Sequence, residues 1–222
     1  MIKRMGIFQR RSDLTLNQFS AYWGKKHSPL VMAMPKFERY TQNHRMDLLP
    51  NFLSEHLGFD IDGIAEMYWQ TDAQMQQDFN SQQGMNVLRQ DETEFMSHIS
   101  VCIAEERKLY GTMSAVKLIL CLSSINSEIN ADNFKLILPN VRGIQMSEVK
   151  SVIQRPQLPP LLYIPQYFFS LWFDQYIDVI TDFESKHWLE FYHQAFVTVD
   201  RASLSLVYPF EVRNLQDISI LK

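Results

Sequence analysis

Cysteine, glycine and long hydrophobic runs are all scarce in this sequence of 222 residues, and each scarcity argues against a class of protein. Its two cysteines, Cys102 and Cys121, lack metal-ligand spacing, which argues against a zinc finger or a disulfide-stapled fold. The 7 glycines form neither a phosphate-binding loop nor a Gly-x-Ser-x-Gly nucleophile elbow. The longest apolar run, residues 118–122, is far shorter than the ~20 residues that span a bilayer, and residues 1–14 are not followed by the apolar core of a signal peptide. We therefore expect a cytoplasmic protein with no membrane partner.

Charge is unevenly distributed along the chain, although the net charge is only −4. Residues 1–45 hold nine Lys or Arg against two Asp or Glu, whereas residues 46–110 hold three against twelve. The basic segment is either an anion site near Arg10, Arg11, Lys25 and Lys26 or one of two segments that neutralise each other across a sheet. Because the aromatic residues alternate with apolar ones and are not interleaved with the basic ones, we expect no nucleic-acid partner.

Alternating apolar residues predict strands over residues 1–10, 36–46, 61–69 and 99–104. Thr15 and Gln18 have the spacing of a capping box, and an apolar stripe from Leu16 to Leu30 then follows at helical spacing. Pro29 should kink or end this helix near residues 25–28, because proline lacks an N–H. Further helices are expected over residues 72–81 and 85–95. The order is βαββαβ, as in a ferredoxin-like fold.

The second half of the chain repeats this order. Residues 65–81 align with residues 169–185 at a constant offset of 104, and the first strands align at an offset of 114. About ten residues are therefore missing from the second copy, at the place where the first copy has residues 22–29. We expect a duplication, with a first ferredoxin-like domain at residues 1–110 and a degenerate second repeat at residues 111–222. Chance similarity of two α+β units is the alternative.

The predicted sheets explain why two copies would occur in one chain. A four-stranded sheet with helices on one face leaves its other face uncovered, and an apolar open face must be buried. Two such sheets packed face to face would close into an α/β barrel. The expected fold is therefore α+β, with two ferredoxin-like units packed as an intrachain pseudo-dimeric barrel. We expect a monomer of this kind, or a homodimer of it.

Five short motifs of the first copy resemble the EthD family in their order and spacing. They are Arg11, Tyr22-Trp23, His27-Ser28-Pro29-Leu30-Val31, Tyr40-Thr41-Gln42-Asn43-His44 and Asp62-Gly63-Ile64-Ala65-Glu66, and residues 91–95 continue the resemblance. That family belongs to the dimeric α/β-barrel superfamily, whose members are typically single units that pair as homodimers. The resemblance implies a ligand-sized barrel. Relatives implicated in polyketide dehydration or ring closure, or in muconolactone isomerisation, imply a lyase or isomerase.

His27 is the first catalytic candidate. It shares a helical stripe with Phe19 and Trp23, which places it on the inward side of the helix beside Pro29. An imidazole with its ordinary pKa of ~6.5 suits a general base at neutral pH. The alternative is a structural histidine that bonds to the carbonyl freed by Pro29.

The strand at residues 61–69 supplies a second group of candidates. Gly63 and Ala65 lie on one of its faces, where their small size permits close packing of helices. Glu66 and Tyr68 lie on the other face, which would line the barrel. Glu66 would then either serve a small-molecule site or pair with a residue such as Arg4 or His44 only to satisfy buried polar groups.

The strand at residues 36–46 supplies a third group. We expect its barrel-lining face to carry Tyr40, Gln42 and His44, so that these groups converge with Glu66 and Tyr68 on one cavity. The equivalent positions of the second copy are more apolar, which places any chemistry in the first copy. Those positions are Ile144, Met146, Glu148, Ser170 and Trp172.

The leading hypothesis is a cofactor-independent lyase or isomerase acting on a small, largely apolar oxygenated compound. His27 would remove a proton beside a carbonyl, and His44 or Glu66 would return or relay it, so all three must open into one pocket. Tyr40 and Tyr68 would hydrogen-bond the developing enolate. The candidate substrate-binding residues are Tyr22, Tyr40, Tyr68 and Arg11, the last for a substrate carboxylate.

Other functions stay open. A ligand carrier or a structural interaction module fits the 11 methionines and the apolar second copy equally well. A cofactor-independent oxygenase of the same superfamily is a further alternative. Some proteins of the superfamily bind haem through a histidine, but no residue here is marked as an axial ligand. The histidines at positions 27, 44, 56 and 98 lack metal-ligand spacing, so no metal site is expected.

Overall fold

The computed structural model describes residues 1–46, 61–123, 131–188, 190 and 202–212 of the chain. The fold is α+β. In the described residues, eight strands form one closed antiparallel barrel in the order β1-β3-β2-β8-β5-β7-β6-β4. The strands are β1 Ile2–Arg10, β2 Arg39–Arg45, β3 Gly63–Trp69, β4 Met96–Gly111, β5 Val116–Leu122, β6 Gly143–Ile153, β7 Tyr167–Phe173 and β8 Ala202–Val212.

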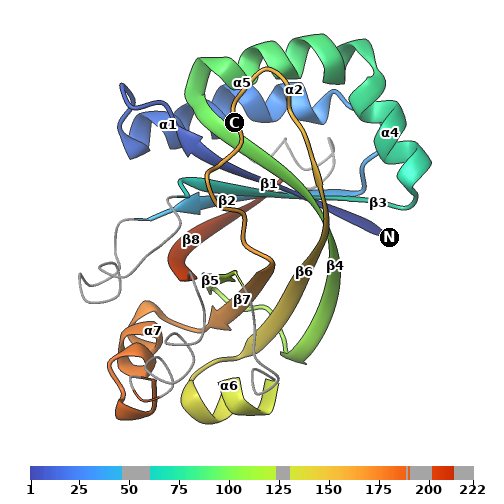
Figure 1. Cartoon of the computed structure of the whole chain (residues 1–222). Coiled ribbons are helices and arrows are strands. Elements are labelled where there is room, and N and C mark those ends of the chain that lie inside the picture. The colour runs from blue at the N-terminus through green and yellow to red at the C-terminus, as the bar shows by residue number, and fades with distance from the viewer. Residues whose placement is uncertain (47–60, 124–130, 189, 191–201, 213–222) are drawn as a thin grey trace.

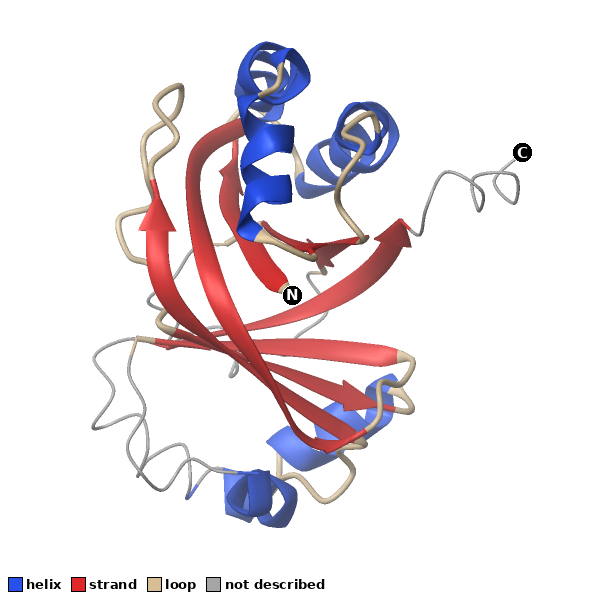
Figure 2. Cartoon of the chain, turned by 90° about the vertical axis from the view of Figure 1, so that its right-hand side faces the viewer, coloured by secondary structure: helices blue, strands red, loops and turns tan. Residues whose placement is uncertain are grey.

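Helices cover the barrel on two opposite sides, as Figures 1 and 2 show. One layer lies over β1–β4 and the other over β5–β8, and we refer to the two sets of elements as the first and second halves. The first layer holds α1 Leu16–Tyr22, the π-helix η1 Trp23–His27, α2 Ser28–Met32, α4 Asp72–Asn80, the π-helix η2 Gln83–Leu88 and α5 Arg89–Phe95. The second holds α6 Ala131–Ile137 and α7 Tyr176–Phe183.

Each half has the predicted strand and helix order. The four strands of the first half stand in the order β4-β1-β3-β2, and those of the second half in the equivalent order β8-β5-β7-β6. Pairing of β2 with β8 and of β4 with β6 joins the two sets into the barrel. No helix in the described part of the chain is long and apolar enough to cross a membrane.

The start of the first helix forms as the sequence predicts. The Thr15 hydroxyl accepts the Gln18 N–H at 3.2 Å, and the Gln18 side chain accepts the Thr15 N–H at 2.9 Å. Next to Pro29 the helix changes from a π-turn to an α-helix and continues. The wider π-turn η1 ends at His27, and α2 begins at Ser28, so Pro29 lies in the first turn of α2, where a missing N–H costs little.

Equivalent elements of the two halves begin at equivalent positions. The strands β2 and β6, the strands β3 and β7, and the helices α4 and α7 each start 104 residues apart. Hydrogen bonds recur at the same offset: the Asp78 carboxylate accepts the Lys36 N–H at 3.2 Å, and the Asp182 carboxylate accepts the Asn140 N–H at 2.9 Å. The two halves therefore share local geometry as well as element order.

The middle of the barrel is apolar and one end is covered. Its buried cluster includes Met5, Ile64, Ile119 and Phe168 from four different strands. The proline-rich connection between β6 and β7, residues 154–166, adds Leu161 to this cluster. The Leu161 N–H donates to the Ser100 hydroxyl at 3.0 Å, so this segment is a packed loop that covers one end of the barrel.

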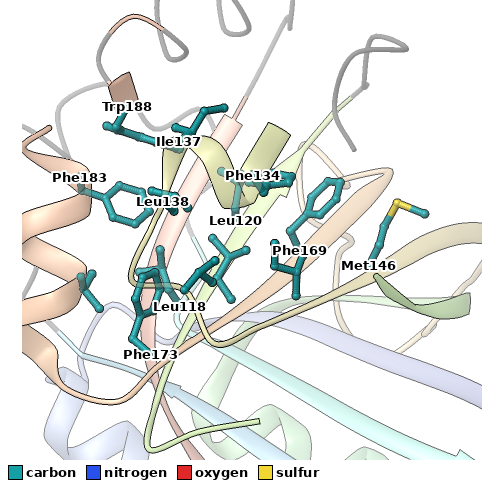
Figure 3. Close-up of a cluster of buried hydrophobic side chains, with 14 of the residues drawn as sticks. Leu118, Leu120, Phe134, Ile137, Leu138, Met146, Phe169, Phe173, Phe183 and Trp188 are labelled. Carbon is teal, nitrogen blue, oxygen red and sulfur yellow. The ribbon is translucent and has the colours of Figure 1, made fainter. Parts of the chain in front are cut away.

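Apolar side chains also fill the space between the second helix layer and its strands. Figure 3 shows Phe169 and Phe173 from β7 meeting Phe134 of α6 and Phe183 of α7, with Trp188 at the edge. The ring centroids of Phe183 and Trp188 are 4.2 Å apart. Burial of these large side chains stabilises the second half through packing alone.

Candidate active site

The structure separates the predicted site residues into three places. Glu66 and Tyr68 lie inside the barrel, whereas His27, His44, Tyr22 and Tyr40 lie between the first helix layer and the outer face of the sheet. Arg11 lies on the surface, bonded to Asp13 at 2.8 Å. The expectation that His27, His44 and Glu66 open into one pocket is therefore wrong, because neither cavity described below is lined by more than one of them.

The error arises on β2, whose two faces are the reverse of those predicted. The outer face, toward the helices, carries Tyr40, Gln42 and His44, and the barrel-lining face carries Thr41 and Asn43. Tyr40 belongs to the core cluster under α2 and α4. Gln42 donates to the Trp23 carbonyl at 3.2 Å, a carbonyl in the π-turn that a polar side chain can satisfy. On β3 the predicted faces are confirmed: Met67 and Trp69 pack beneath the helices.

His44 is a packing residue of this layer. Its ring lies 4.3 Å from that of Trp23, and its Nε2 donates to the Gln42 amide oxygen at 2.9 Å. Burial lowers the pKa of His44 to about 4, so the ring is neutral at pH 7. It does not line the cavity that contains His27.

The Tyr40 hydroxyl is available to donate a hydrogen bond. That oxygen accepts hydrogen bonds from the Trp23 indole N–H at 3.1 Å and from the Gln42 amide at 2.7 Å. Its own proton has no acceptor in the described part of the chain. Burial raises the pKa of Tyr40, so the phenol keeps this proton at neutral pH.

His27 is held by an acidic partner to which the sequence motifs gave no role. Its Nδ1 donates to Asp91 Oδ2 at 2.7 Å, and the Tyr22 hydroxyl donates to Asp91 Oδ1 at 2.8 Å. The ring packs 5.1 Å from that of Phe95. Burial, and then the bond to Asp91, raise the pKa of Tyr22 to about 12. Asp91 thereby fixes the orientation of His27 and leaves Nε2 as its basic nitrogen.

A second polar group of the same layer surrounds Glu92, the neighbour of Asp91 on α5. Arg155 and Gln157, from the loop after β6, both donate to the Glu92 carboxylate. This loop belongs to the second half of the chain, so the first helix layer is completed by a segment far away in the sequence. The loop has no periodic pattern, and only its prolines marked it in the sequence.

Arg4 faces these groups from β1. Its side chain is only 8% exposed, and its guanidinium carbon lies 3.6 Å from the centroid of the Phe79 ring. Burial, and then the charge of Arg155, lower the pKa of Arg4 to about 9. The guanidinium is therefore still protonated at neutral pH.

A cavity of about 40 Å³ lies among these residues. Its lining includes His27, Arg4, Glu92 and Tyr40, which supply a base, a cation, a carboxylate and a hydroxyl donor. The rest of the lining is apolar and includes three methionines, whose flexible side chains can move aside for a ligand. In this conformation the space holds two or three waters, since one water needs roughly 10–15 Å³. The methionines are Met34, Met67 and Met96.

Glu66 belongs to a separate network at the open end of the barrel. Lys117 Nζ lies 3.3 Å from its carboxylate and Lys3 Nζ lies 3.6 Å away. Burial alone would raise the pKa of Glu66, but Lys117 and then Lys3 outweigh it and lower the pKa to about 2. The predicted alternative is that Glu66 pairs with Arg4 or His44 only to satisfy buried polar groups. Glu66 does pair with buried groups, but these are Lys117 and Lys3.

This network connects the two halves. Lys117 of β5 donates to Asn43 of β2 at 2.9 Å, and Lys3 of β1 donates to Ser147 of β6 at 2.8 Å. A second cavity, of about 160 Å³, lies beside it at the barrel mouth. Among the described residues, no three His, Cys, Asp or Glu side chains are grouped as a metal site needs.

Comparison with known families supports the resemblance that the sequence motifs indicated. The family model described as EthD domain matches residues 11–99. Residues 11–99 are an EthD domain. This EthD segment contains His27, Asp91 and Glu92, and it begins after Arg4. The Arg155 loop lies outside it. No curated protein sequence matches the chain.

Solved structures share the fold over nearly the whole chain. An anthrone oxidase-like protein superposes with a TM-score of 0.59 at 6% identity, covering 95% of this chain and 92% of the other. A protein proposed to be a monooxygenase, from Fusobacterium nucleatum, superposes with a TM-score of 0.54 at 8% identity, covering 96% and 94%. At these identities the likeness establishes the fold, so the EthD domain and its companion half share an architecture with both proteins.

Proposed function

We propose that the chain is a small-molecule enzyme that transfers a proton on a small oxygenated compound, with His27 as the base. The observation that carries the proposal is the pairing of His27 Nδ1 with Asp91 at the wall of a cavity that also contains Arg4 and Tyr40. A histidine held by a carboxylate in an enclosed, largely apolar space is a common arrangement for proton abstraction.

The geometry supports a defined role for each group. With Nδ1 donating to Asp91, Nε2 accepts the proton of a carbon beside a carbonyl, and the Asp91 carboxylate stabilises the imidazolium that results. The Tyr40 proton stabilises the enolate oxygen, and the Arg4 guanidinium adds a positive charge to the lining of the same cavity. His44 and Glu66 leave the mechanism because they do not line this cavity. His27 is then the group that returns the proton in an isomerase or passes it to a leaving group in a lyase.

Deuterium exchange tests the proposal even while the natural substrate is unidentified. A panel of small ketones, aldehydes and oxo acids is incubated with the protein in D2O, and loss of the α-proton signal is followed by NMR. We expect exchange of at least one compound, reduced about 10²–10⁴-fold in His27→Gln. His44→Gln is the matched control and keeps most of the activity. Equal exchange in His27→Gln and wild type would contradict the role of His27, and binding without exchange would make the protein a carrier.

A cofactor-independent oxygenase is a second candidate. The superposing structures described as an anthrone oxidase-like protein and as a proposed monooxygenase favour it. An oxygen electrode separates the two candidates: dioxygen uptake that depends on His27 supports the oxygenase, and exchange without uptake supports the lyase or isomerase.

We also propose that residues 1–110 and 111–222 are two copies of one unit fused as a pseudo-dimer. The equivalent strand orders, the offset of 104 and the crossed lysine contacts to Asn43 and Ser147 support this proposal. In it, the second copy serves as wall and support for the single site of the first. Analytical ultracentrifugation is the test: an active species of 26.2 kDa is expected, and activity only in a larger species would favour a homodimer.

A further inference from the structure

The buried guanidinium of Arg4 has more cations than carboxylates around it. The charges of Arg155 and Arg89 both act on Arg4, and Glu92 is the carboxylate that acts on it. Asp91 is occupied by His27 and Tyr22. A buried cation without a full set of partners is costly, so such a cluster calls for an occupant.

The hydrogen bonds of this cluster are incomplete. The Arg4 guanidinium forms no hydrogen bond or ion pair with any residue that the structure describes, although it is only 8% exposed. Arg89 Nε, Arg155 Nε and Gln157 Oε1 are also buried, and they have no hydrogen-bond partner among the residues that the structure describes. Buried polar groups are nearly always bonded, and unbonded ones are characteristic of a water, ion or ligand site.

The unpaired guanidinium lines the same cavity as the base. Arg4, His27 and Tyr40 all contribute to the wall of that cavity, and Phe79 and the methionines make the rest apolar. Arg155 reaches Glu92, which also lines the cavity, and so brings a second cation close behind the wall. An acidic group bound at Arg4 would therefore hold a small molecule in the cavity that His27 also lines.

We infer that the cavity selects a small oxo-carboxylate, with its carboxylate on Arg4, its carbonyl oxygen at Tyr40 and its acidic C–H at His27. This inference rests on the proposed function and names its substrate class. A carboxylate accepts the parallel N–H groups of a guanidinium, which gives orientation as well as attraction. Glu92 in the same wall disfavours a second negative charge on the ligand. In this inference Arg4 takes the carboxylate-binding role that the sequence suggested for Arg11.

Pyruvate and pyruvamide form a matched pair of probes, because they differ only in a carboxylate oxygen against a neutral amide nitrogen. We expect pyruvate to bind at least about tenfold more tightly, as measured by NMR chemical-shift titration. Arg4→Met should abolish that preference and leave pyruvamide binding unchanged, and Arg4→Lys should restore part of it. Arg39→Met is the matched control, because Arg39 also lies on an aromatic ring, that of Tyr68, but lines only the barrel-mouth cavity.

Binding and exchange are scored separately, so the two proposals can fail independently. His27→Gln should keep the pyruvate preference while it loses α-proton exchange. Equal affinity for pyruvate and pyruvamide, equal loss in Arg4→Met and Arg39→Met, or no binding of pyruvate at millimolar concentration would each overturn the inference. Exchange of neutral ketones in the same protein would still support His27 as the base. Competition by chloride as effective as that by pyruvate would also overturn it, because the site would then hold any small anion.

Discussion

The two helix layers of the barrel share a frame but differ in what fills it. In the second half, Phe183 packs against Trp188 in an apolar cluster (Figure 3). The equivalent residues in the first half are Phe79 and Gly84, and the guanidinium of Arg4 covers the Phe79 ring. Gly84 lets η2 lie close to α4, since a Cβ there would be 2.4 Å from the Asp78 carbonyl.

A layer that keeps a cavity for a ligand loses apolar contacts that would otherwise stabilise the fold. Apolar contacts fill the second layer, whereas the first contains a cavity and borders polar atoms that have no partner in the described part of the chain. Cavities and unsatisfied polar groups lower stability, so they persist where chemistry requires them. If the first layer serves chemistry and the second serves stability, variants in the first should lower activity and variants in the second should lower the free energy of unfolding.

The largest effect is expected at Asp91. Asp91→Asn removes the carboxylate that holds His27 and stabilises its charged form, so we expect α-proton exchange to fall about 10²–10⁴-fold with little change in folding. Exchange rates and urea unfolding measure the two effects. Glu94→Gln, an exposed change on the same helix, is the control. A large loss of stability with unchanged activity would show that Asp91 stabilises the fold and has no part in proton transfer.

The second-largest effect is expected on stability, and it lies in the second layer. Phe183→Ala should lower the free energy of unfolding by about 3–5 kcal/mol, because a fully buried ring leaves a cavity. Phe79→Ala should cost clearly less, since Phe79 is only half-buried and already borders a cavity. Urea unfolding of both variants measures the difference. Equal losses would mean that the two layers contribute alike to stability.

The interface between the halves gives an effect of similar size. Lys117 is 3% exposed, and Lys117→Met leaves Glu66 with only Lys3, so we expect a loss of about 3 kcal/mol. The double variant Lys117→Met with Glu66→Gln should be more stable than the single lysine variant, because it removes the uncompensated charge. Additive losses in a double-mutant cycle would show that the pair is not coupled.

The smallest effect is a pH dependence located in the first half. Burial lowers the pKa of His44 to about 4, so the unfolded state binds a proton first as the pH falls. The stability that this group contributes is complete above about pH 6.5 and is lost between there and about pH 4, by up to about 3 kcal/mol. His44→Phe keeps the contact with Trp23 and should flatten the stability curve in that window. An unchanged slope would show that His44 titrates normally.

Most of the fold follows from the sequence because alternation and capping are local. Thr15 and Gln18 form their box, and β3 presents Glu66 inward and Met67 outward as its period-2 pattern predicts. On β2 the same reasoning gave the wrong face, because a run such as Tyr40–His44 is polar on both sides. Only the packing of η1 against β2, where Gln42 reaches the Trp23 carbonyl, decides which side is buried under helices.

The candidate site was predictable only in part. His27 could be found from its helical stripe and its motif, and Asp91 lies in a motif that was noted without a role. The contributions of Arg4, Glu92 and Arg155 depend on contacts between β1, α5 and a loop of the second half, and such contacts leave no local pattern. A buried arginine on a strand with no acidic residue nearby in sequence was the one available signal.

The position of a bound oxo-carboxylate in a crystal structure of the complex tests the central claim most directly. We expect the ligand between Arg4 and His27, with a C–H beside His27 Nε2 and with Nδ1 still bonded to Asp91. A ligand bound instead at the barrel mouth beside Lys117 and Glu66 would contradict this claim.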